Sequence, residues 1–124
     1  MNHGEAGKVT PGKAESQLRK GALEYCVLAL MRDRPRYGVE LLQELEASGA
    51  LATSQGTVYP LLSRLRRDGL TTTTWQESTA GPPRRYYALT DSGRAALDTF
   101  TRVWPAFRDA VDTFLTPHHT GGDA

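Results

Sequence analysis

The sequence predicts a mostly helical α+β fold, in which three helices and a two-stranded hairpin are followed by one long C-terminal helix. Three observations support this prediction. Apolar residues recur at helical spacing through the first half of the chain, two threonine- and tyrosine-rich stretches flank a Gly-Pro turn, and a regular apolar seam runs through the C-terminal part. A length of 124 residues fits one domain with a modest core.

Both ends of the chain are expected to lie outside the folded domain. Residues 1–16 are polar and predict a disordered N-terminal arm, whereas residues 17–90 contain the patterned segments of a domain. A separate helix is expected over residues 91–115, and residues 116–124 predict a flexible tail. The N-terminus lacks the apolar core of a signal peptide, and no segment could span a membrane, so a cytoplasmic location without membrane contact is expected.

The first helix is expected over residues 17–32, and Pro35 ends it because the residue before a proline avoids the helical conformation. Its apolar face is formed by Leu23, Cys26, Val27 and Leu30. The chain has one cysteine, which excludes an intrachain disulfide. A thiol in an apolar helical run is expected to act as a small buried hydrophobe.

Two shorter helices follow. The second is expected over residues 37–47, with Val39 in its buried stripe. The third begins after the natural N-cap Ser54 and ends at Gly69, which suits the left-handed position after a helix. Its buried stripe consists of Val58, Leu61, Leu62 and Leu65. The opposite face carries Gly56, Tyr59, Pro60, Ser63, Arg64 and Arg67.

Two strands are expected over residues 71–77 and 84–89, because threonine and aromatic residues favour strands. The Gly-Pro-Pro sequence between them predicts a long loop at the tip of a protruding hairpin, with Trp75 packed at its base.

The last helix begins after Thr90, and its apolar residues are spaced 3, 4, 3, 4, 3. They are Leu97, Phe100, Trp104, Phe107, Val111 and Phe114. Packing on its own domain is one way to bury this seam. The domain core is complete without it, however, so burial against a second copy in a homodimer is the simpler solution.

Positive charge lies where this arrangement would meet DNA. The net charge is only +1, yet arginines and lysines are concentrated in residues 17–36 and 51–88. A helix followed by a basic hairpin is the DNA-reading half of a winged helix-turn-helix. Candidate base-reading residues are Gln55, Thr57, Tyr59 and Ser63. Candidate phosphate contacts are Gly56, through its backbone, and Arg64, Arg67, Arg84 and Arg85.

The chain resembles the PadR family of transcriptional regulators over about four-fifths of its length. The residues that carry the resemblance are LRKGALEYCVLALM, RYGVELLQEL, GTVYPLLSRLRRDGL and GPPRRYYALTDSGRAAL. The resemblance implies a dimeric repressor that contacts double-stranded DNA through the helix beginning at Gly56 and through the wing. It also points to the compact subfamily with a single C-terminal dimerisation helix. One departure is Val39, where relatives often carry tyrosine.

Twofold symmetry would predict a pseudo-palindromic operator with half-sites about one helical turn, or a multiple of it, apart. Because family members sense phenolic compounds or planar drugs, the resemblance also suggests a small aromatic effector. Phe100, Trp104 and Phe107 are candidates for its pocket, with ordinary packing in the dimer core as the alternative.

Other functions have weaker support. No catalytic or phosphate-loop motif is present, so neither an enzyme nor a cofactor is expected. The histidines His3, His118 and His119 lie in the expected tails, and no metal site is expected. The main alternative to a DNA-binding regulator is a winged-helix module that binds protein without specific DNA binding.

Overall fold

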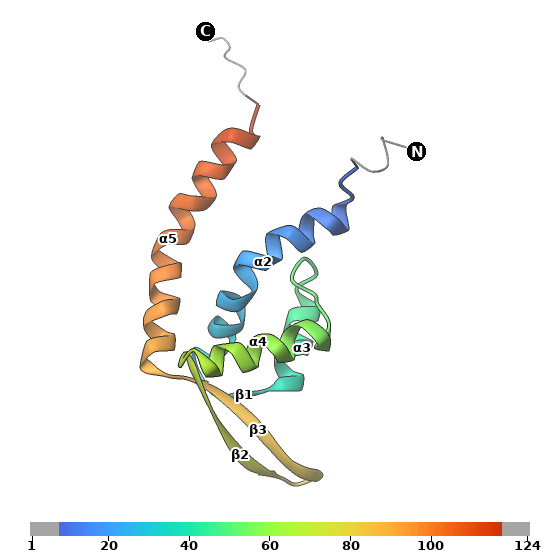
Figure 1. Cartoon of the computed structure of the whole chain (residues 1–124), viewed down its shortest axis with the longest axis vertical. Coiled ribbons are helices and arrows are strands. Elements are labelled where there is room, and N and C mark those ends of the chain that lie inside the picture. The colour runs from blue at the N-terminus through green and yellow to red at the C-terminus, as the bar shows by residue number, and fades with distance from the viewer. Residues whose placement is uncertain (1–7, 118–124) are drawn as a thin grey trace.

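The computed structural model describes residues 8–117 and gives four helices and a three-stranded antiparallel sheet over that range (Figure 1). In chain order the elements are α2 (Pro11–Leu30), β1 (Arg36–Tyr37), α3 (Gly38–Ala47), α4 (Gln55–Arg67), β2 (Thr71–Ser78), β3 (Gly81–Leu89) and α5 (Asp91–Leu115). The predicted fold class is therefore confirmed, with one additional short strand.

Helix α2 begins earlier than the sequence suggested. Thr10 caps it by accepting a hydrogen bond from the Lys13 backbone N–H at 3.2 Å, and Pro11 occupies the first turn, where its missing N–H costs nothing. The expectation of a disordered arm is therefore wrong for the residues from Pro11 onward. The first seven residues of that arm and the last seven of the expected tail lie outside the described residues.

The core lies where α2, α3 and α4 meet. It consists of Leu23, Val27, Leu28, Met31, Leu41, Leu45, Val58, Leu61, Leu62, Leu65, Tyr87 and Leu97. Cys26 packs at the edge of this core, and partial burial raises the pKa of its thiol. Val39 does not join the core: it is 46% exposed, because the face of α3 that carries Leu41 and Leu45 turns inward.

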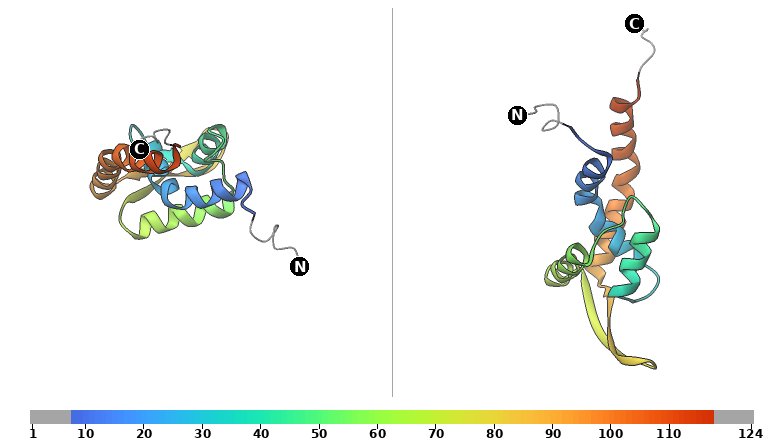
Figure 2. Two further views of the ribbon diagram at one scale, coloured as in Figure 1. Left: turned by 90° about the horizontal axis from the view of Figure 1, so that it is seen from above. Right: turned by 90° about the vertical axis from the view of Figure 1, so that its right-hand side faces the viewer.

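The hairpin of β2 and β3 extends away from the helices as a wing (Figures 1 and 2). Ser78 pairs with Gly81, so the turn is shorter than the loop expected from the sequence. Pro82 and Pro83 lie within β3, next to a shift of register. A bulge accommodates residues that cannot donate to the ladder, which is why a turn-like sequence continues the strand.

Strand β1 completes the sheet by pairing with β3 at Tyr86 and Tyr87. The sheet order is β1-β3-β2. Two residues are too few to show the alternation by which a strand is recognised in a sequence, so β1 was not predicted.

Helix α5 is joined tightly to the end of α4. The Thr90 hydroxyl accepts from the Gly93 N–H at 3.0 Å and donates to the Gly69 carbonyl at 2.6 Å. The helix then runs beside α2 before the two diverge (Figure 1). Leu97 is only 3% exposed and belongs to the domain core, so its assignment to the dimer seam is wrong. Leu97 lies about one and a half turns into α5, where this side of the helix still packs against the domain.

Gly93 provides a test of this joint. A Cβ added there would collide with the carbonyl oxygen of Leu70, which is backbone and cannot move aside cheaply. Gly93→Ala should therefore lower the free energy of unfolding by about 1–3 kcal/mol, measured by urea denaturation. Gly12→Ala is the matched control, because a Cβ at Gly12 meets nothing within 4 Å. Equal stability of the two variants would contradict the described joint.

Candidate nucleic-acid interface

The first turn of α4 is open to solvent. Gln55, Gly56 and Thr57 are exposed, as are Ser63 and Arg67 further along. A Cβ at Gly56 would approach only the Ser54 hydroxyl, at 3.6 Å, so no contact within the domain requires glycine there. The exposed N–H groups and positive dipole of a helix N-terminus favour an anionic group.

Two of the predicted interface residues are instead engaged within the domain. Tyr59 is half-buried, and its ring lies so close to Gly38 that a Cβ there would be 2.6 Å from the Tyr59 Cε1 atom. Arg64 forms an ion pair with Glu24 of α2 at 3.1 Å and a longer one with Asp68 at 3.9 Å. Tyr59 and Arg64 thus hold α4 against its neighbours on two sides.

The two wing arginines point in opposite directions. Arg84 pairs with Gln76 and Arg85 with Trp75, and neighbouring pairs on a ladder face opposite sides of the sheet. The Arg84 guanidinium lies 4.5 Å from the ring centroid of Tyr37, whereas that of Arg85 lies 5.5 Å from the ring centroid of Trp75.

Arg85 is the wing arginine on the α4 side. A shallow depression between α4 and β3 is lined by Ser63, Arg66, Arg67, Arg85 and Tyr87. Arg66 is not among the residues predicted from the sequence, although its charge and its place beside Arg67 indicate the same surface. Trp75 does not pack at the wing base as expected: it is 67% exposed, and Thr71 is the buried residue at the start of β2.

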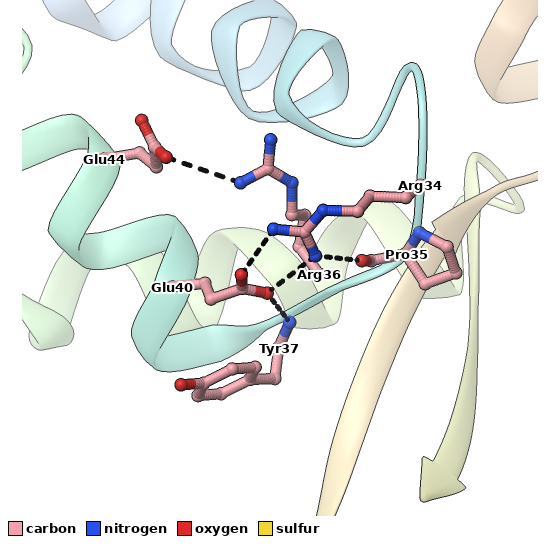
Figure 3. A network of polar contacts seen from close by, with 6 residues as sticks. All are labelled: Arg34, Pro35, Arg36, Tyr37, Glu40 and Glu44. Carbon is pink, nitrogen blue, oxygen red and sulfur yellow. Dashed lines mark hydrogen bonds and ion pairs between the residues drawn. The ribbon is translucent and has the colours of Figure 1, made fainter.

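A polar network fixes the start of α3 and the strand before it (Figure 3). Arg34 donates to both carboxylate oxygens of Glu40, at 2.6 and 3.3 Å, and to the Pro35 carbonyl at 3.1 Å. Glu40 also accepts from the Tyr37 backbone N–H at 3.2 Å, while Arg36 pairs with Glu44 at 3.5 Å.

This network shifts the ionisation of its members. The Arg34 hydrogen bonds hold the pKa of Glu40 below its ordinary value, and Glu40 raises the pKa of Arg34. The network also places Tyr37, whose ring lies under Arg84 and edge-on to Tyr86 at 5.5 Å.

An apolar groove of about 700 Å³ lies between α2 and α5, at the other end of the domain from the wing. Phe100 stacks on Tyr25 with ring centroids 4.3 Å apart, and Trp104 follows at 5.7 Å from Phe100. Phe107 is 6.4 Å beyond Trp104. The structure thus brings the three candidate effector residues together along one wall of the groove. Val111 and Phe114 continue the seam and are exposed.

Residues 8–117 contain no cluster of three or more histidine, cysteine or acidic side chains that could hold a metal ion. His3, His118 and His119 lie outside this range. The same residues include no helix with the length and apolar character needed to cross a membrane.

Comparison with known proteins points to one family. Residues 27–99, more than half of the chain, match the transcriptional regulator PadR-like family. A solved PadR-like transcription factor from Bacteroides fragilis is 40% identical, covers 82% of this chain and 97% of its own, and superposes with a TM-score of 0.67. A PadR-like transcriptional regulator from Bacillus cereus is 35% identical, with coverages of 82% and 99% and a TM-score of 0.74. A transcriptional regulator of Mycobacterium tuberculosis is 38% identical over 65% of this chain and 74% of that protein.

Glu40→Gln tests the α3 network. Because the pKa of Glu40 is lowered by folding, its carboxylate stabilises the domain above the unfolded value of about 4.3, and this contribution disappears as pH falls through the folded-state pKa. The variant should be less stable than wild type at neutral pH, and the difference should close toward pH ~3. Urea unfolding at both pH values measures it.

Glu46→Gln is the control, because Glu46 is exposed near the end of α3 and forms no ion pair among residues 8–117. A Glu40→Gln deficit that stays constant across this pH range would contradict the described network.

Proposed function

The chain belongs to the PadR-like family of transcriptional regulators, and from this premise we propose that it is a homodimeric, sequence-specific DNA-binding repressor. This family consists of transcriptional regulators, not enzymes. The single observation that carries the DNA-binding proposal is the joint exposure of the first turn of α4 and of the basic depression that connects α4 to the wing.

In the proposed complex, α4 enters a major groove and the wing lies along the adjacent backbone. Gln55 and Thr57 read base edges from the first turn, and Ser63 follows two turns later. Arg67 and Arg85 bind phosphates on the α4 side of the wing, joined by the backbone of Gly56. Arg84 is proposed to meet phosphate from the other face of the wing.

Tyr59 and Arg64 have a different place in this proposal from the one the sequence suggested. Their contacts with Gly38 and Glu24 favour a role in setting the angle at which α4 is presented. Because the Arg64 guanidinium is held toward Glu24 and Asp68, we assign Arg64 a structural role in place of the phosphate contact suggested by the sequence.

The exposed seam of α5 supports a dimer. Trp104, Phe107, Val111 and Phe114 are between 40% and 89% exposed, and their spacing places them on one side of the helix. An apolar stripe of this size is typically buried against a partner, and a second copy supplies the same stripe. Phe100 borders the interface from within the domain, since it stacks on Tyr25. Twofold symmetry then favours a pseudo-palindromic operator.

The α2–α5 groove supports the further proposal of a small aromatic effector. Its wall of Phe100, Trp104 and Phe107 offers flat apolar surfaces on which a planar molecule could stack. The same surfaces would serve equally well as packing for the partner's α5, so the groove supports the dimer first and the effector second.

Substitutions of Arg67 and Gln55 test the affinity and the sequence specificity of DNA binding separately. Arg67→Ala should weaken binding to all DNA sequences alike and reduce the slope of log K against log salt by about 1. Gln55→Ala should instead change the preferred sequence. Competition gel shifts on DNA from upstream of the protein's own gene, over a range of salt concentrations, measure both effects.

Wild-type binding that is absent, or insensitive to salt, would contradict the DNA-binding proposal and favour the alternative of a protein-interaction module. An unchanged preference in Gln55→Ala would remove Gln55 from the reading residues while leaving DNA binding intact.

Phe107→Glu tests the dimer. A charge in the centre of the seam should give a monomeric mass in analytical ultracentrifugation and weaken binding to a two-site DNA by about a hundredfold, because the second half-site is no longer bound by the same particle. Arg102→Glu is the control on the opposite side of α5, where helical periodicity places it away from the seam. A dimer that survives Phe107→Glu would refute this interface.

A further inference from the structure

Trp75 is a large aromatic residue that the domain core does not use. It lies in the middle of β2, 67% exposed, and is absent from the core and from the residues packed against it. Single exposed apolar side chains are common on protein surfaces, so what sets Trp75 apart is its contact with a wing arginine beside the basic depression.

The register of the wing shows which way Trp75 faces. Its cross-strand partner is Arg85. Thr71, four residues before Trp75, and Tyr87, two residues after Arg85, lie on the same face of the strands. Thr71 and Tyr87 are buried beneath the helices, so this face runs outward from the core along the wing. It is also the face of the depression lined by Ser63, Arg66 and Arg67 of α4.

Trp75 and Arg85 form a stacked pair on that face. The guanidinium carbon lies 5.5 Å from the ring centroid, within the range of a cation–π contact. Contact with an aromatic face leaves the edge of a guanidinium open for a planar, bidentate acceptor such as phosphate. The Arg85 Nε is buried without a hydrogen-bond partner among residues 8–117, so the two terminal nitrogens of the guanidinium are the atoms that would meet a phosphate.

The neighbouring pair is built differently. Arg84 lies over Tyr37, which is half-buried and belongs to β1, in the body of the domain. Trp75 by contrast lies on the wing itself, directly across the strand pair from Arg85. The contact between Trp75 and Arg85 is therefore made within the wing and needs no residue from the body of the domain.

We propose that Trp75 is a DNA-contacting positioning residue, whose indole holds the Arg85 guanidinium toward a phosphate and itself lies against the sugar–phosphate backbone beside the groove occupied by α4. The proposal rests on the DNA-binding function proposed above and adds a residue to that site. A polyanion is the favoured partner because the adjoining depression is lined by three arginines and no carboxylate.

Titrating wild type and Trp75→Phe with labelled duplex DNA from upstream of the protein's own gene tests this role. Anisotropy of the label reports binding, and protein emission with acrylamide quenching reports the indoles. Binding should protect Trp75 from acrylamide in wild type. Trp75→Phe should still bind but lose that protection, because Trp104 is its only remaining indole and lies on α5, at the other end of the domain.

Removing the ring should act through Arg85. Trp75→Ala should weaken binding by about three- to tenfold and lower the salt slope by about 1, as Arg85→Ala does, while Trp75→Phe restores most of both. The double variant should bind no more weakly than Arg85→Ala alone. Thr72→Ala, on the opposite face of the same strand and paired with Ala88, is the control and should bind as wild type.

The outcomes separate the two proposals. Wild-type protein that does not bind the duplex overturns the DNA-binding function, and the role of Trp75 with it. Wild-type protein that binds without protecting Trp75, or a Trp75→Ala variant with an unchanged salt slope, overturns the role of Trp75 alone and leaves its exposed ring as a surface for a protein partner.

Discussion

The burial of one apolar stripe on α4 is the constraint on which the rest of the molecule depends. Val58, Leu62 and Leu65 are completely inaccessible, and Leu61 is nearly so. Fixing that side of the helix also fixes the side left in solvent. Tyr59 against Gly38 and Arg64 with Glu24 then brace the helix on its two flanks. The buried stripe and these two contacts fix the orientation of α4, and in that orientation its first turn faces solvent.

The parts of the fold that depend on local signals could be predicted from the sequence. The α4 stripe, the cap at Thr90 and the left-handed Gly69, with φ of 79°, each follow from a few neighbouring residues. Tertiary partners could not be predicted in the same way. The Arg64–Glu24 pair joins residues 40 positions apart, and Leu97 is buried only because α5 leans on the domain. For the candidate site, the exposed residues of α4 were identified, whereas the opposite facing of Arg84 and Arg85 required the strand register.

The surroundings of the α5 seam change along a single spacing pattern. Its first members, Leu97 and Phe100, belong to the domain, through the core and through Tyr25. From Trp104 onward the same pattern is left in solvent. A regular heptad pattern predicts an apolar helix face, but it does not predict what covers that face. Packing against the same domain and packing against a second copy require the same residue types. The change from buried to exposed seam residues occurs where α2 and α5 diverge (Figure 1).

The hydroxyl of Thr90 has a mechanical consequence. By bridging Gly69 and Gly93 it links the end of α4 directly to the beginning of α5. A tilt of α5 relative to its own domain would therefore be passed on to the end of α4. With 25 residues, α5 is about 37 Å long, so a tilt of about 5° at one end displaces the other by about 3 Å. In the proposed dimer, such a tilt would change the spacing of the two α4 helices by about the rise of one base-pair step, without any helix bending or unfolding.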